Sequence, residues 1–257
     1  MTGLSGVLAS LQSHGESWRA SVPDSWLQGR TAYGGLSTAL ALQTAKLAHP
    51  DLPPLRSALV AFVGPLAGEI RLSSTLLRRG RNAAFVRVDV AGEAGLGLTV
   101  TFVFMRALGS SVDHVAATAP AVAWPKPGDP ISRGLPQVAF TQHFEMLDCH
   151  DTSLGPADWL RWVRLAERDG LDPEVELVAV ADCLPPGALR LIGGHAPVSS
   201  MTWQINLLAQ PTTNDDWFLM RTTSDFTCAG TSSQNMAIWS ASGVPVAQQM
   251  QSVALFV

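Results

Sequence analysis

The chain has 257 residues, enough for one large domain or two small ones with a substantial buried core. A net charge of −4, without a long run of basic residues, argues against a nucleic-acid partner, and apolar runs of strand length argue against a membrane span. Three widely spaced cysteines are typical of reduced thiols, and the N-terminus lacks the pattern of a secretion signal. We therefore expect an ordered cytoplasmic protein.

The first half predicts a buried helix followed by four strands. Gly34-Gly35 precedes residues 36–47, which are rich in helix formers and nearly uncharged, and His49-Pro50 follows them. A helix that is apolar on all sides is a buried helix. The segments with strand-like patterns that follow are Leu59–Val63, Ile70–Leu77, Ala84–Val90 and Leu98–Met105.

The second half repeats this order. Residues 173–184 predict another buried helix, with Asp172 as its N-cap and Pro185-Pro186 after its end. The strand-like segments that follow are Met201–Leu208, Trp217–Phe226, Ser233–Ser240 and Val246–Val257. Because a Pro- and Gly-rich stretch separates the two copies, we expect three parts: an N-terminal unit of residues 1–123, a linker of residues 124–138 and a C-terminal unit of residues 139–257.

Asp182 is the most unusual residue of the second predicted helix. It lies in the run Val-Ala-Val-Ala-Asp-Cys-Leu, where its neighbours are almost all apolar. A carboxylate in such a setting costs several kcal/mol unless a hydrogen bond compensates it. Asp182 is therefore either a structural hub or a catalytic group, and the apolar setting by itself favours the structural role.

The repeated order of elements predicts an α+β fold, because an apolar helix and the strands that follow it bury their apolar surfaces on each other. This order resembles the hotdog fold, and two copies in tandem resemble the double-hotdog acyl-CoA thioesterases of the TesB type. The resemblance implies a double hotdog of two antiparallel sheets, each wrapped around a long central helix. Its marks are Tyr33-Gly34-Gly35, Pro65, Ala181-Asp182, Pro211 and residues 246–251 on the last strand.

The resemblance implies hydrolysis of an acyl-CoA thioester by an activated water, without a cofactor or a metal. Thioester hydrolysis needs a group that activates the water and a group that stabilises the oxyanion. Carried over by position, Asp182 is the acid and Gln251 is the amide that holds the water. The family also has a hydroxyl residue that helps to hold the water, and its position corresponds to Met201 here. A shift of one residue would place Thr202, which we favour, or Ser200 at that position.

The first half supplies a different part of the expected site. Its buried helix contains no carboxylate, so one active site per chain is expected, with the first repeat as a degenerate partner. Gly34 and Gly35 would present backbone N–H groups to the thioester oxygen at the positive end of the helix dipole. Alternatively, these glycines only let the helix pass close to the sheet.

Two other functions remain open at this point. Met201 favours a non-catalytic acyl-CoA or lipid binder that kept the fold and lost the water site. A hotdog enoyl-thioester hydratase or dehydratase would need a histidine paired with an acid, and His195 is the histidine near the second helix. The mean hydropathy of +0.18 predicts a homodimer or higher homo-oligomer, with Trp203, Leu207 and Trp239 as candidates near the contact.

Overall fold

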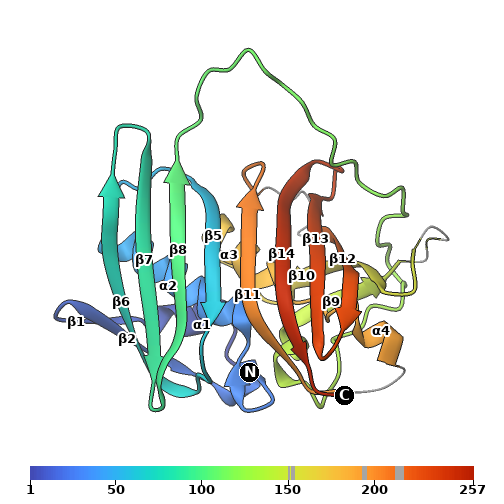
Figure 1. Cartoon of the computed structure of the whole chain (residues 1–257), viewed down its shortest axis with the longest axis horizontal. Coiled ribbons are helices and arrows are strands. Elements are labelled where there is room, and N and C mark those ends of the chain that lie inside the picture. Colours follow the sequence, from blue (N-terminus) through green and yellow to red (C-terminus); the bar gives the residue numbers. More distant parts are fainter. Residues whose placement is uncertain (150, 152–153, 193–195, 212–216) are drawn as a thin grey trace.

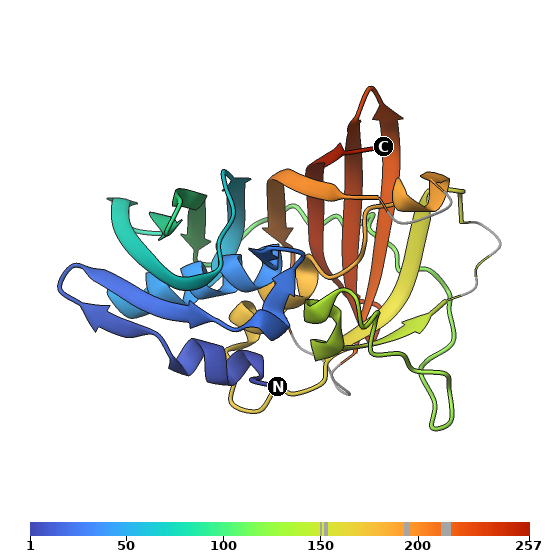
Figure 2. The same ribbon diagram turned by 90° about the horizontal axis from the view of Figure 1, so that it is seen from below.

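The computed structural model describes residues 1–149, 151, 154–192, 196–211 and 217–257. Within these residues the strands form one large antiparallel sheet and a small two-stranded one (Figure 1). The large sheet has twelve strands in the order β1-β2-β6-β7-β8-β5-β11-β14-β13-β12-β10-β9. Two helices, α2 and α3, lie behind the middle of this sheet, which curves around them when seen from below (Figure 2).

The first half contains the predicted helix and all four predicted strands, each longer than the sequence pattern indicated. Helix α2 begins at Gly34 rather than Leu36, and ten of its residues are buried, as expected for a helix without a polar face. Residues before α2 add strands β1 and β2 to the sheet edge. The elements are α1 (Leu4–Ala9), β1 (Gln12–His14), β2 (Ser17–Val22), η1 (Asp24–Trp26), β3 (Leu27–Gln28), β4 (Thr31–Ala32), α2 (Gly34–Ala48), β5 (Leu55–Phe62), β6 (Gly68–Arg79), β7 (Ala83–Gly92) and β8 (Gly95–Met105).

The second half repeats the helix and the four strands, and its helix is shorter than predicted. Helix α3 ends at Ala181, so Asp182 is its C-cap rather than an internal residue. Two further strands, β9 and β10, lie outside the predicted segments. The elements are η2 (Ala139–His143), β9 (Phe144–Asp148), β10 (Asp158–Leu165), α3 (Pro173–Ala181), α4 (Leu189–Ile192), β11 (Val198–Leu207), β12 (Phe218–Cys228), β13 (Thr231–Ser240) and β14 (Pro245–Leu255).

The two expected sheets join edge to edge, because strands β5 and β11 pair with each other across the two halves. Their register runs from Thr202 opposite Ala61 to Asn206 opposite Ser57. An edge strand exposes unpaired N–H and C=O groups, and pairing the two halves satisfies the groups at both inner edges. The two repeats therefore share one continuous sheet.

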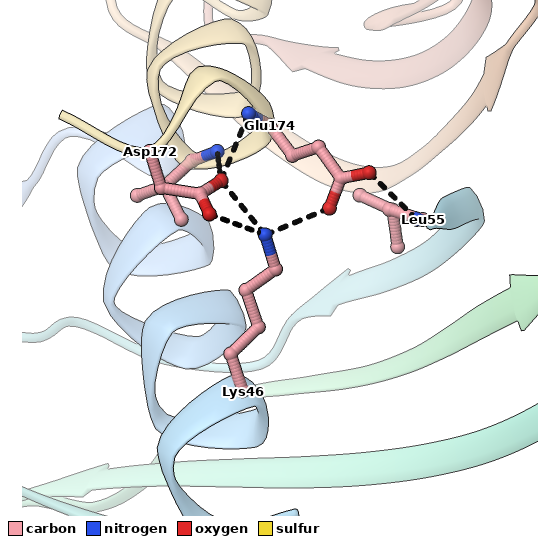
Figure 3. A network of polar contacts seen from close by, with 5 residues as sticks. Lys46, Leu55, Asp172 and Glu174 are labelled. Carbon is pink, nitrogen blue, oxygen red and sulfur yellow. Dashed lines mark hydrogen bonds and ion pairs between the residues drawn. The ribbon is translucent and has the colours of Figure 1, made fainter. Parts of the chain in front are cut away.

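Helices α2 and α3 run antiparallel across the junction between the halves. Lys46, near the C-terminal end of α2, lies between the carboxylates of Asp172 and Glu174 at the N-terminal end of α3 (Figure 3). The Lys46 Nζ atom is 2.7 Å from Asp172 Oδ2 and 2.8 Å from Glu174 Oε2, and the Leu55 amide donates to Glu174 Oε1. The Asp172 side chain also caps α3, as the sequence predicts.

Lys46→Met should lower the free energy of unfolding by about 2–3 kcal/mol, because it leaves the Glu174 carboxylate, 8% exposed, without its cation. The measurement is urea unfolding near pH 7. Arg87→Met is the matched control, since the ion pair between Arg87 and Asp89 lies on the surface and should contribute less than about 1 kcal/mol. Equal losses of unfolding free energy in the two variants would show that the Lys46 ion pairs stabilise the fold no more than a surface ion pair does.

The connection between the halves covers part of the outer sheet face, which is the face away from α2 and α3. It runs from Arg106 to Val138, further than the expected linker, and forms the arc above the sheet in Figure 1. The indole N–H groups of Trp162 and Trp239 donate to the carbonyls of Ala123 and Ala117 in this connection, each at 2.9 Å. The connection therefore packs against its own second half.

Candidate active site

Asp182 contacts both halves of the protein. Its position just after α3 places it beside β14, and Gln251 Nε2 donates a hydrogen bond to Asp182 Oδ1 at 2.8 Å. The two side chains therefore touch directly, whereas two groups that hold one water between them would lie further apart. Gln251 is 5% exposed and on the inner sheet face, while Asp182 as a residue is half-buried. The structure thus brings together the predicted acid and the predicted amide.

The N-terminal end of α2 closes the site from the first half. A Cβ atom on Gly34 would lie 2.5 Å from Asp182 Oδ2, and one on Gly35 would lie 2.6 Å from the carbonyl oxygen of Ala179. The Tyr33 hydroxyl donates to that same carbonyl at 2.8 Å, which fixes α3 against the start of α2. The two glycines thus allow a close approach of α2 to α3 with Asp182 and, at Gly34, to the Phe62 ring at the end of β5.

Burial raises the pKa of Asp182 from its ordinary value of 3.8 to about 7. The hydrogen bond from Gln251 and the backbone amide of Gly35 both favour the ionised carboxylate, and they oppose the larger effect of burial. Solvent still reaches part of the residue, so the burial is incomplete. A carboxyl group with a pKa near neutrality can accept a proton from water and release it again at physiological pH.

The structure does not bring Thr202 to this carboxylate. Thr202 is exposed on the outer face, where it borders a groove of about 410 Å³ together with Leu59 and Met250. Gln251 and Trp203 border the same groove, but both are buried and Gln251 points inward to Asp182. No hydrogen bond from Thr202 to Asp182 or Gln251 occurs among the described residues, so our preference for Thr202 is corrected.

A β-bulge at Met201 explains this outcome. The pairing with β14 shifts between Ser200 and Thr202, which leaves Met201 as the extra residue. Ser200 pairs with Val253, and Val253 is buried on the same face as Gln251 because the two are two residues apart in one strand. Of the two hydroxyl residues considered, Ser200 is therefore the one on the face of Asp182.

Two further glutamines near the site were missed in the sequence. Gln249 is buried two residues before Gln251 on β14, and Gln234 is buried directly opposite Gln251 on β13. Each has a side-chain Nε2 atom without a hydrogen-bond partner among the described residues. A buried donor without a partner costs about 1–3 kcal/mol. The run Val-Ala-Gln-Gln-Met-Gln contained the available signal, since alternation puts Gln249 on the face of Gln251.

The fold defines a protein of the hotdog class. A hotdog-fold protein of unknown function from Alicyclobacillus acidocaldarius is 19% identical, with a TM-score of 0.85. The match covers 100% of this chain and 99% of that protein. The tesB protein of Mycobacterium avium subs paratuberculosis is 17% identical, with a TM-score of 0.81 and coverage of 99% and 100%. An acyl-CoA thioesterase II from Mycobacterium marinum is also 17% identical, with a TM-score of 0.80 and coverage of 99% and 98%.

The sequence identifies the family within this class. The family model of the acyl-CoA thioesterase N-terminal domain matches residues 22–119, and that of the C-terminal domain matches residues 112–255. The chain belongs to the acyl-CoA thioesterase family. No curated protein matches it in sequence.

Proposed function

We propose that the chain hydrolyses acyl-CoA thioesters with Asp182 as the general base. The observation that carries this proposal is the Asp182 carboxyl group, held by Gln251 of the second half against the N-terminal end of α2 from the first half. A carboxylate takes a proton from water, and the resulting hydroxide attacks the thioester carbonyl carbon. The carbon–sulfur bond then breaks, and the proton passes to the departing thiolate of CoA.

The other predicted residues have supporting roles in this proposal. Gln251 orients the water through its amide, and Ser200 is the hydroxyl residue that we now favour for contact with that water. The backbone N–H groups of Gly34 and Gly35 lie at the positive end of α2 beside Asp182, and such a helix end stabilises an oxyanion. Since Gly35 N–H already supports Asp182, the oxyanion role falls first to Gly34.

The test is a spectrophotometric assay of thiol release across acyl-CoAs of increasing chain length. We expect turnover with at least one acyl-CoA in the absence of added metal or cofactor. Tight binding of acyl-CoA without any release of thiol would instead favour the non-catalytic binder, for which the missing contact between Thr202 and the site is the supporting observation. A hydratase would add water to an enoyl-CoA without thiol release; His195, its histidine, lies outside the described residues.

The pH dependence of hydrolysis should show an acid limb near pH 7. Activity requires the ionised carboxylate, so kcat/KM should rise with pH through the Asp182 pKa of about 7. Gln251→Leu removes a hydrogen bond that favours the ionised form, so it should raise this pKa and shift the acid limb to higher pH. In contrast, Gln248→Leu changes the neighbouring outward-facing glutamine and should leave the limb in place. An unchanged pH for the acid limb in Gln251→Leu would show that Asp182 is not the titrating base.

Assembly and location remain proposals. We propose a homo-oligomer of at least two chains in the cytoplasm, but Trp203, Leu207 and Trp239 are buried within one chain and cannot form its contact. Light scattering should give at least twice the chain mass of 27.3 kDa, and a mass of one chain would rule the oligomer out. None of the helices within the described ranges is both long enough and apolar enough to cross a membrane.

A further inference from the structure

The inner faces of the two half-sheets differ in polarity although the halves repeat the same elements. The inner face of the first half is apolar on each of its three central strands: Ile70 and Leu72 on β6, Val86 and Val88 on β7, and Val100 and Phe102 on β8 are all buried. The corresponding strands of the second half carry buried Thr222 on β12, Ser232 and Gln234 on β13, and Gln249 and Gln251 on β14. Packing against a helix does not require these polar groups, because the first half packs without them.

The orientation of two of these amides is fixed by their partners. Trp203 Nε1 donates to Gln249 Oε1 at 2.8 Å, and the Gly187 amide donates to Gln234 Oε1 at 2.7 Å. An indole N–H and a backbone N–H are donors only, so each glutamine must present its oxygen to them and its NH₂ group elsewhere. The oxygen and the NH₂ group of each side chain are therefore assigned by its own partner.

Both NH₂ groups are buried donors that lack an acceptor among the described residues. Gln234 is fully buried and Gln249 is 5% exposed. They lie on two sides of Gln251: Gln249 is two residues away along β14, about 7 Å, and Gln234 is directly across on β13, about 5 Å. The Thr222 hydroxyl, on the next strand, is a third buried group without a partner. Buried polar groups are otherwise almost always satisfied, so two unpaired donors on two sides of Gln251, which itself binds the Asp182 carboxyl group, indicate a binding surface.

We propose that the NH₂ groups of Gln249 and Gln234 bind an oxygen atom on the acyl group of the substrate, so that the enzyme prefers acyl-CoAs with a hydroxyl or carbonyl oxygen in the acyl chain. This inference rests on the proposed thioesterase function and specifies its substrate class. The charged end of CoA stays near solvent, so the deeply buried donors face the acyl group.

The test compares hexanoyl-CoA with its hydroxy and oxo derivatives in the thiol-release assay. Wild-type kcat/KM should be at least about tenfold higher for an oxygenated derivative. A plain alkyl chain leaves the buried donors of the site unpaired, and this lowers kcat/KM for hexanoyl-CoA. Gln249→Met and Gln234→Met should each reduce this ratio about tenfold. The hydroxy derivatives decide the outcome, because an oxo group near the thioester changes its intrinsic reactivity.

Met236→Leu is the matched control, since Met236 is on the same inner face opposite Gln249 and offers no donor. It should leave the ratio unchanged. A wild-type protein with equal kcat/KM for both acyl groups overturns the inference and leaves the thioesterase function intact. Equal losses for both substrates in the glutamine variants also overturn it, because the donors would then serve the CoA arm, which is common to both, or the fold.

Binding gives a second readout that does not depend on turnover. Calorimetry with the Asp182→Asn protein should show a lower Kd for hydroxyhexanoyl-CoA than for hexanoyl-CoA, by about tenfold. Absence of thiol release from every substrate would refute the proposed function, and the two Kd values would still decide the inference. Equal Kd values would overturn it.

Discussion

Asp182→Asn should reduce thioester hydrolysis by about a hundredfold or more, as the loss of a general base typically does. Asparagine keeps the size of the side chain and an oxygen that can accept the hydrogen bond from Gln251 Nε2, so the protein should stay folded. The measurement is steady-state thiol release at pH 8, where the wild-type carboxyl group is mostly ionised. Turnover close to that of the wild type would make Asp182 a structural hub.

The same substitution should change how stability depends on pH. The pKa of Asp182 is raised to about 7 in the folded protein, so the folded state holds a proton that the unfolded state releases above about pH 4. The stability that this group contributes is therefore complete below about pH 4 and is lost as the pH rises to about 7. The loss approaches about 4 kcal/mol for a fully buried group, and less where solvent reaches the carboxyl group.

Urea midpoints at pH 5 and pH 8 test this second consequence. Asparagine does not titrate, so Asp182→Asn should flatten the decline in stability between these two values. The variant should thus gain stability relative to the wild type at pH 8 while it loses activity. An identical decline in both proteins would show that the Asp182 carboxyl group is not desolvated in the folded state.

Gly34→Ala should reduce hydrolysis by about tenfold to a hundredfold, because a small displacement of a catalytic group has effects of this size. The new Cβ atom would lie 2.5 Å from Asp182 Oδ2 and 2.9 Å from the Phe62 ring, so the carboxyl group must move away from the end of α2. The measurement is kcat/KM for the best acyl-CoA, together with the pH of the acid limb.

Gly35→Ala provides the comparison, because its Cβ atom would meet the Ala179 carbonyl oxygen and the Tyr33 ring, each at 2.6 Å. Neither of these is a flexible side-chain end, so the two helices must separate, at a cost of about 1–3 kcal/mol or more in the free energy of unfolding. Gly34→Ala should therefore mainly lose activity and Gly35→Ala should mainly lose stability. Wild-type kcat/KM in Gly34→Ala would show that the carboxyl group need not lie against α2.

Much of the fold was predictable because it depends on local patterns. The helix of residues 36–47 is apolar on all sides, and the strands after it alternate in a way that the sheet confirms. The cap at Asp172 and the contact of Asp182 with Gln251 also agree with the sequence. Each of these features follows from spacing within one segment or from the repeated order of elements.

The features that escaped prediction depend on pairing between distant segments. The β5–β11 ladder joins the two expected sheets, and the sequence of neither strand specifies which strand of the other half it pairs with. The bulge at Met201 changes which hydroxyl faces inward, because a shift of one residue moves a side chain to the other face. Gln249 was missed because a glutamine on a strand looks like a solvated residue until its burial is known, although alternation with Gln251 offered a signal.

The antiparallel arrangement of α2 and α3 places Asp182 between two opposed helix ends. The positive end of α2 favours its ionised form, whereas the negative end of α3, which it caps, favours the protonated form. The balance between these fields depends on how far one helix slides along the other, and Lys46 holds that alignment at the opposite end of α3, roughly 14 Å away. We therefore expect the acid limb of hydrolysis to shift when contacts between α2 and α3 change, even where those contacts lie far from the substrate.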